Sequence, residues 1–247
     1  MLPYHRKLLS AVGGGGFQVD AVTFDGSNDH LNRGADLTGN SDGTTGIFSC
    51  WLKSNSDVGT QIIYQNANDQ FIIRKESGTN LIRVIIKDTS FNADVEITSS
   101  NGYTTADGWF HVLVAWNTAT TTGQMYINDA SDIGVNNIVS DTLDYTQAEH
   151  VIGANSGGSG EFLNADMAEF YLNLGEYLDI SSSANRRKFI SASSKPVDLG
   201  ADGSLPTGTA PIIYLNGPAT GFETNNGTGG NFTENGTLTD ASTSPSD

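Results

Sequence analysis

The sequence predicts an all-β protein, folded as a two-sheet antiparallel jelly-roll sandwich with one short helix. Runs of β-branched and aromatic residues recur at a spacing of about ten residues, separated by Gly, Asn, Asp and Ser. Several runs alternate in polarity: Ile82, Val84 and Ile86 fall on one side of a strand, and Arg83 and Lys87 on the other. Before residue 180, no stretch of useful length repeats with the period of a helix.

The predicted strands follow these alternating runs along the chain. Val112, Val114 and Trp116 form a second clear apolar face, so core packing is the expected role of Trp116. In chain order the strands are expected at residues 21–24, 46–53, 61–65, 71–75, 80–87, 94–98, 109–116, 124–128, 150–153, 167–172 and 212–215.

The pattern changes after residue 180. Residues 183–190 suit a short surface helix with Ser182 or Ser183 as its N-cap. Its basic residues, Arg186, Arg187 and Lys188, are expected on a solvated face. We therefore expect a sandwich at residues 17–180 and a C-terminal extension at 181–247, with a helix, a strand and loops packed on the sandwich.

The amino terminus differs in character from the rest. Residues 1–12 are basic and apolar, and Gly13 to Gly16 follow as a flexible hinge. The apolar stretch at residues 8–12 is shorter than a secretory signal requires. Two interpretations stay open: residues 1–16 are a docking arm that attaches the body to a larger partner, or an unattached terminus.

Charge and composition exclude several functions. There are 28 acidic and 12 basic residues, for a net charge of −16, so we expect no nucleic-acid partner and no anionic lipid surface. No apolar run is long enough to span a membrane. The single cysteine, Cys50, leaves no internal disulfide, and its apolar strand predicts a buried thiol.

Four segments together resemble laminin-G-like, concanavalin A-like jelly rolls. The opening strand and turn are AVTFDGSNDHL at 21–31, and an aromatic strand follows, IFSCWLK at 47–53. The paired central strands are GWFHVLVAWN at 108–117 and GQMYIN at 123–128, and the returning strand is DMAEFYL at 166–172. The resemblance covers about residues 20–175.

A second resemblance concerns the C-terminal part. The sequence NRRKFI at 185–190, the segment 195–215 and GTGGNFTENG at 227–236 together resemble the C-terminal extension of lectin-like structural proteins in tailed bacteriophages. This resemblance implies a virion component, either a capsid decoration protein or a part of a tail or fibre.

The first turn offers a candidate metal site. The loop at 25–29 concentrates oxygen ligands of the kind that Ca²⁺ prefers. Laminin-G-like domains often carry a structural Ca²⁺ near this turn, and their first strand lies beside the late one. Our hypothesis is a Ca²⁺ site formed by Asp25, Asn28 and Asp166. The alternative is an Asx turn in which the aspartate only accepts hydrogen bonds.

We expect no catalytic activity. Sandwich glycosidases need paired carboxylates on one strand face, and the sequence has no acid-x-acid-x-acid alternation. His5, His30, His111 and His150 form no metal-binding spacing, although a triad around one of them stays open. Trp51 and Trp109 are candidates for stacking on sugars, and the loops at 132–137 and 154–160 for ligand contact.

The sequence therefore predicts a non-enzymatic protein on the surface of a phage virion. It would attach to other virion proteins through residues 1–16 and expose the sandwich, with weak host-glycan binding as an added role. A free carbohydrate-binding, lectin-like module is the alternative, followed by a glycan-cleaving enzyme. A homo-oligomer stays open.

Overall fold

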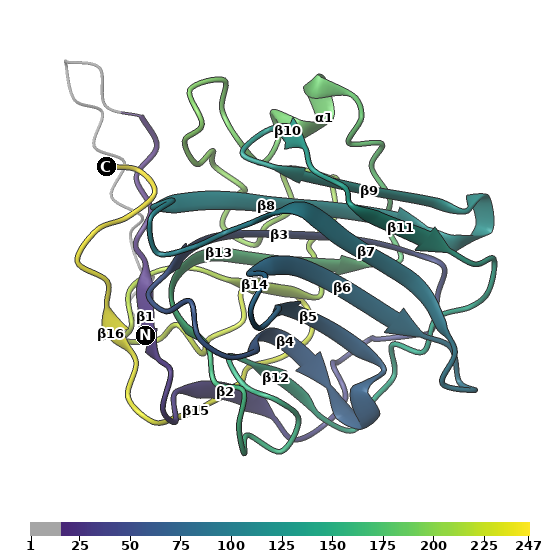
Figure 1. Ribbon diagram of the computed structural model, residues 1–247, viewed down its shortest axis with the longest axis horizontal. Coiled ribbons are helices and arrows are strands. Elements are labelled where there is room, and N and C mark those ends of the chain that lie inside the picture. The colour runs from purple at the N-terminus through teal and green to yellow at the C-terminus, as the bar shows by residue number, and fades with distance from the viewer. Residues whose placement is uncertain (1–15) are drawn as a thin grey trace.

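The computed structural model describes residues 16–247 and forms two antiparallel eight-stranded sheets packed face to face (Figure 1). Sheet one runs, in spatial order, through β10 (Ala130–Ser131), β9 (Thr122–Ile127), β8 (Trp109–Asn117), β3 (Thr45–Ser54), β13 (Asn164–Leu174), β1 (Val22–Asp25) and β16 (Thr239–Asp240), and β14 (Ile213–Leu215) also pairs with β13. Sheet two contains β11 (Val135–Ile138), β7 (Ala93–Gly102), β6 (Leu81–Lys87), β5 (Phe71–Lys75), β4 (Gln61–Asn66), β12 (His150–Ile152), β2 (His30–Arg33) and β15 (Thr233–Asn235).

The predicted fold class is confirmed, and each predicted run overlaps a strand. The helix is shorter than predicted, since α1 covers only Ser183–Arg186. Sequence patterns missed β2, β10, β11, β15 and β16. These strands are two to four residues long, Leu31 is their one buried residue, and none shows a polarity alternation. The backbone of a neighbouring strand orders them, which no local pattern records.

The main core lies between the sheets and follows the predicted alternation. Val112, Val114 and Trp116 of β8 are fully buried, as are the predicted inward residues of β6. On the outer side of sheet two, Arg83 is half-buried and pairs with Glu76 at 3.0 Å and Glu96 at 2.7 Å. The outer face of sheet two is therefore mixed, since Ile72 and Ile85 pair on the same side as Arg83.

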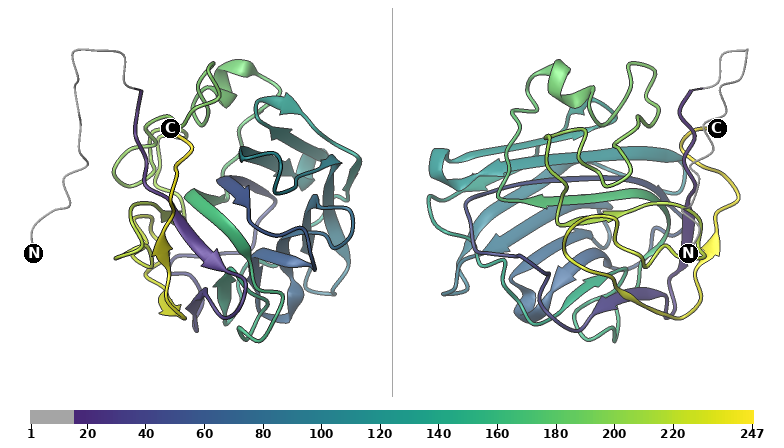
Figure 2. Two further views of the ribbon diagram at one scale, coloured as in Figure 1. Left: turned by 60° about the vertical axis from the view of Figure 1, so that its left-hand side comes forward. Right: turned by 180° about the vertical axis from the view of Figure 1, so that it is seen from behind.

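Sheet one is buried on both faces. Ile47, Leu113 and Tyr171 point away from the main core, where residues of the C-terminal extension cover them. Figure 2 (right) shows the loops of this extension lying across the strands of sheet one. The extension also sends Phe222 and Phe232 into the main core and contributes β14, β15 and β16 to the sheets.

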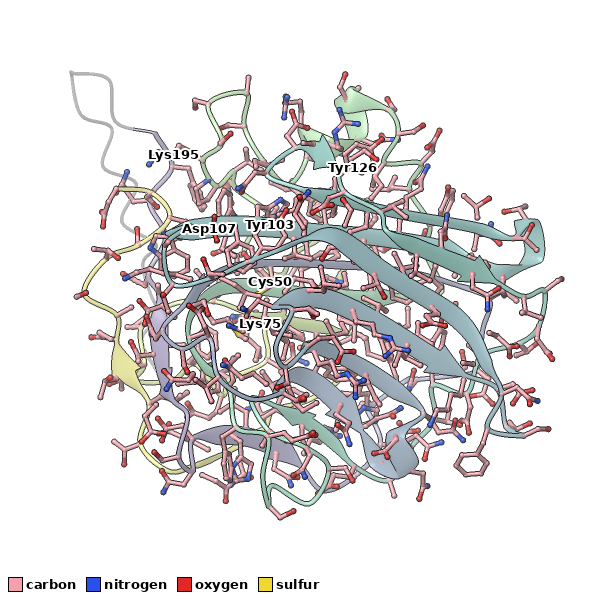
Figure 3. The ribbon with its side chains drawn as sticks, in the orientation of Figure 1. Cys50, Lys75, Tyr103, Asp107, Tyr126 and Lys195 are labelled. Atoms are coloured by element: carbon pink, nitrogen blue, oxygen red, sulfur yellow. The ribbon has the colours of Figure 1, made fainter. Side chains whose placement is uncertain are left out.

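The basic residues of the extension join it to the sandwich. Arg186 Nε lies 2.6 Å from Asp129 Oδ1, and its guanidinium lies 4.2 Å from the ring centre of Tyr126 on β9 (Tyr126 is labelled in Figure 3). Arg187 pairs with the same carboxylate, and Lys188 Nζ donates to the carbonyl of Pro206. Burial alone would raise the pKa of Asp129, but its hydrogen bonds from the two guanidiniums hold that pKa below its usual value. The expectation of a solvated basic face was therefore wrong for Arg186 and Arg187, which are half-buried and hold α1 against the β9–β10 turn, whereas Lys188 is exposed as expected.

No helix between residues 16 and 247 has the length and apolar character needed to cross a bilayer.

Candidate functional site

The structure brings two of the three predicted Ca²⁺ ligands to one face of sheet one. In the β1–β13 pair, Thr23 lies opposite Asp166 and Asp25 lies opposite Asn164, so the two aspartates are diagonal neighbours on the outer face. Asp25 Oδ1 accepts hydrogen bonds from the backbone N–H groups of Ser27 at 2.8 Å and Asn28 at 3.3 Å. This geometry is the Asx turn that was the alternative interpretation.

Asp166 is buried and already surrounded by donors. Its carboxylate accepts from Thr23 Oγ1 at 2.8 Å, Asn55 Nδ2 at 2.8 Å and Lys53 Nζ at 3.1 Å. The Lys53 ammonium supplies the positive charge that a metal ion would bring. Ca²⁺ binding at Asp25, Asn28 and Asp166 stays a prediction, and it would compete with these contacts.

The turn between β6 and β7 presents an aromatic ring to solvent. Phe91 is 57% exposed, and it is the one exposed aromatic residue in the described part of the chain. Its φ of +66° is unusual for a bulky residue. Asp88 holds the turn, because its carboxylate accepts from the backbone N–H groups of Ser90 and Asn92, both at 2.8 Å.

Three carboxylates converge at the same turn. Asp88 follows β6, Asp94 lies near the start of β7 and Asp141 follows β11, and one carboxylate oxygen of each lies within 4.8 Å of the other two. The backbone N–H of Val139 donates to the Asp94 carbonyl at 2.8 Å, which keeps the segment after β11 beside β7. Sequence reasoning missed this cluster because Asp141 comes from a distant segment that only sheet pairing brings here.

The pair Asp25 and Asp166 lies at one end of the sandwich, and the cluster of Asp88, Asp94 and Asp141 lies at the other. β1 and its turn are on the left side of Figure 1, and the β6–β7 turn is on the right. They can therefore be tested separately.

The two predicted ligand-contact loops are held by internal hydrogen bonds or sheet pairing. Residues 135–137 of the first loop belong to β11, so this segment is partly a strand. Asp132, just before it, accepts four hydrogen bonds, from the Ser100 backbone N–H and hydroxyl, Asn101 Nδ2 and Tyr103 Oη. In the second loop, Asn155 Oδ1 accepts from the backbone N–H groups of Ser159 and Gly160, both at 2.9 Å.

The tryptophans and the cysteine contribute mainly to packing. Trp116 is fully buried as predicted, and Trp51 packs on the outer face of sheet one beneath the extension. Trp109 is half-buried, and its Nε1–H donates to Thr243 Oγ1 at 3.2 Å. Cys50 lies inside the sandwich, as predicted (Figure 3), and burial raises the pKa of its thiol well above the usual value.

One serine–histidine pair forms in the structure. Ser49 Oγ lies 2.8 Å from His111 Nε2, and both residues are buried. Burial lowers the pKa of His111 to about 3, so the imidazole is neutral at physiological pH. Its Nδ1 is buried with no hydrogen-bond partner, so the third member of a catalytic triad is missing there.

The chain resembles two solved structures over much of its length. The similarity to a Bacteroides ovatus protein to which carbohydrate binding has been attributed covers 91% of this chain and 60% of that protein, with 13% identity and a TM-score of 0.62. It is also similar to the heptameric SAP-like pentraxin of Limulus polyphemus, with 16% identity, a TM-score of 0.51 and coverage of 66% of this chain and 78% of the pentraxin. At such identities these similarities show the fold alone.

The sequence itself identifies the family. No curated protein sequence matches this chain. A family model, however, matches residues 25–173, which run from the end of β1 to β13 and include most strands of both sheets. The chain belongs to the concanavalin A-like lectin/glucanases superfamily, as a domain of the laminin-G type.

Proposed function

We propose that this chain is a non-catalytic carbohydrate-binding module whose contact surface is the β6–β7 turn around Phe91. The exposed ring of Phe91 carries the proposal, because an aromatic face at a loop tip packs against the C–H face of a sugar. Ser90 and Asn92 flank Phe91 in the sequence, and both are tied to the Asp88 carboxylate, which orders the turn that carries the ring. The superfamily, and the carbohydrate binding attributed to the Bacteroides ovatus protein, support this chemistry.

Several features support binding without catalysis. The Ser49–His111 pair is buried and has no acid on Nδ1. Glu169 is also buried, and its carboxylate accepts from the Tyr214 hydroxyl at 2.5 Å. A retaining or inverting glycosidase needs two accessible carboxyl groups across a bound sugar. These buried groups do not provide such a pair.

Several copies together would make weak sites effective. A single ring and a few polar groups give weak binding, and multivalent display raises the overall avidity without new contacts. The Limulus pentraxin is heptameric. An oligomer of this chain, or many copies on one particle, would serve the same purpose.

Replacing Phe91 with alanine should weaken glycan binding about tenfold, the equivalent of about 1.4 kcal/mol of lost ring contact. Glycan-array screening of the full chain identifies a ligand, and calorimetry then compares the wild type with Phe91→Ala. The matched control is Val58→Ala, on another loop, where an 81% exposed apolar side chain is removed. Unchanged affinity in Phe91→Ala, or a wild type that binds no glycan on the array, would contradict the proposal.

Display on a tailed-phage particle is the second candidate function. The resemblance of residues 185–236 to the C-terminal extension of phage structural proteins supports it. Attachment is assigned to residues 1–16, of which 1–15 lie outside the described residues. The acidic character of the chain, which carries a net charge of −16 in all, would keep such a surface from binding DNA.

Particle occupancy tests this role. Deleting residues 1–16 should remove the protein from purified particles, while the isolated chain keeps its melting temperature. Quantitative mass spectrometry of particles assembled with either form measures the copy number. Full occupancy without residues 1–16 would show that they are not the attachment.

A further inference from the structure

We propose that a groove between the two ends of the described chain is a second carbohydrate site, which binds a terminal sugar of a neutral glycan. One wall of this terminal groove is formed by residues 18–21, directly before β1, and the other by the C-terminal residues 240–244 and Asp247. The inference rests on the proposed function for the class of ligand only, because the terminal groove lies at the opposite end of the sandwich from the β6–β7 turn (Figure 1).

Two hydrogen bonds tie the walls together and leave the terminal groove between them. The backbone N–H of Ala241 donates to the Ala21 carbonyl at 2.9 Å, and the backbone N–H of Val19 donates to Ser246 Oγ at 2.8 Å. Between these ties the first wall contains only Asp20, whereas the second contains residues 242–245. The longer wall therefore arches away from the shorter one, as the yellow C-terminal segment in Figure 1 shows.

Sheet one holds this arch in place. Thr243 Oγ1 accepts from Trp109 Nε1 at 3.2 Å and from Lys53 Nζ at 3.4 Å, and the backbone N–H of Ser244 donates to Asp247 Oδ2 at 2.8 Å. The volume of the terminal groove is about 330 Å³, and sites for small molecules have about 300–1,000 Å³. The terminal groove is therefore formed in advance, which lowers the entropy cost of binding a small ligand.

The lining combines apolar and polar groups, as a sugar ring requires. Val19 and Ala21 belong to the hydrophobic cluster that also contacts Trp109, and they offer apolar contact to C–H groups. Asp20 and Ser242 are exposed, and no described residue forms a hydrogen bond with either side chain. A free carboxylate accepts strong, charge-assisted hydrogen bonds from hydroxyls. The remaining polar side chains that line the terminal groove are Gln18, Asp240, Thr243, Ser244 and Asp247.

Charge and spacing restrict the ligand to a neutral sugar. Asp20, Asp240 and Asp247 line the terminal groove and no described Lys or Arg does, so an acidic sugar is repelled. These three carboxylates also do not converge on one point. In the part of the chain that the structure describes, only the aspartates at the β6–β7 turn bring three such groups within 4.8 Å of one another. Separated acceptors suit hydroxyls spread around a ring better than a single metal ion.

An NMR titration of the ¹⁵N-labelled full chain tests the site. The probes are glucose, galactose and mannose, each compared with its uronic acid, in which a carboxylate replaces the primary alcohol. We expect at least one neutral sugar to shift the amide signals of residues 18–21 and 240–247 in a saturable way. Its uronic acid should bind about tenfold more weakly, because the like charges of the lining oppose it.

Removing the free carboxylate should weaken this binding. Asp20→Ala is expected to bind the same sugar about tenfold more weakly, since it loses a charged acceptor. Asp20 forms no hydrogen bond with a described residue, so the fold should be unchanged. The matched control is Glu161→Ala, which removes another exposed carboxylate outside the terminal groove and should bind like the wild type.

Trp109 provides a spectroscopic readout of the same event. It is half-buried beside the arch, whereas Trp51 and Trp116 are buried. The sugar that shifts the amide signals should therefore change the tryptophan fluorescence of the wild type and leave that of Trp109→Phe unchanged.

Several results would overturn the site. They are the absence of amide shifts at residues 18–21 with every neutral sugar, equal binding of the uronic acid, and full affinity in Asp20→Ala. Shifts caused by CaCl₂ in place of sugars would make the terminal groove a cation site instead. Phe91→Ala should keep the response of the terminal groove, and Asp20→Ala should keep the binding that depends on Phe91. Failure of one site is therefore distinguishable from failure of the other.

Discussion

A chain that ends at residue 180 is expected to lose cooperative folding. Without residues 181–247, β13 loses its partner β14, β1 loses β16 and β2 loses β15. The outer face of sheet one then exposes a continuous apolar surface that includes Ile47, Leu113 and Tyr171. Each such side chain contributes about 1.5–3 kcal/mol when buried, and a whole domain is stable by only about 5–15 kcal/mol. The deletion therefore removes more stabilising free energy than the whole free energy of unfolding of the domain.

Circular dichroism and calorimetry measure this loss. The truncated chain should keep part of its far-UV signal, lose its near-UV signal and show no sharp melting transition. A cooperative melt close to that of the full chain would instead make 181–247 a separable unit.

Two point substitutions in the extension make the same test without truncation. Phe222 is fully buried in the main core, and Leu205 is 62% exposed. Phe222→Ala should lower the free energy of unfolding by about 3–5 kcal/mol, and Leu205→Ala by less than about 0.5 kcal/mol. Similar losses for both would indicate that the extension is not part of the core.

Replacing Trp116 with alanine should lower the free energy of unfolding by about 4 kcal/mol. The indole is fully buried and meets the ring of Phe71 edge-to-face, with centroids 5.6 Å apart. Its Nε1–H donates to the Tyr145 hydroxyl at 2.7 Å, and that hydroxyl donates to the Thr45 carbonyl at 3.1 Å. The substitution therefore opens a cavity and also removes a buried hydrogen bond.

Urea unfolding separates these two contributions. Tyr145→Phe keeps the ring and removes only its hydroxyl, so a loss of about 1–2 kcal/mol is expected. Gly46 offers an independent check, since a Cβ there would overlap Cζ2 of the Trp116 ring. Gly46→Ala should therefore destabilise by about 1–3 kcal/mol through overpacking. A loss below about 1 kcal/mol in Trp116→Ala would mean that the indole is not a core residue.

Sequence patterns predicted the strands that build the core but not those at the edges. In β6 and β8 the side chains alternate between core and outside, and this alternation is visible within the strand itself. β10, β15 and β16 pair through backbone groups and bury little, so their sequences carry no comparable signal. The role of Arg186 and Arg187 was missed for a similar reason, because Asp129 belongs to a distant turn.

The candidate sites show the same difference between contacts within one segment, which the sequence reveals, and contacts between distant segments, which it does not. Asp25 and Asn28 are neighbours in sequence, so a turn rich in oxygen ligands was visible at once, whereas the cation beside Asp166 was not, since Lys53 comes from another strand. Asp88 and Asp94 meet Asp141 only because β11 pairs with the edge of β7.

The amino-acid order is sufficient to establish the core strands, the sandwich and the acidic character of the surface, because these follow from residues close together along the chain. Sheet pairing and the packing of the extension decide which carboxylates meet, which cations neutralise them and which aromatic ring is left in solvent. Those outcomes depend on contacts between distant segments, and such contacts exist only once the chain has folded.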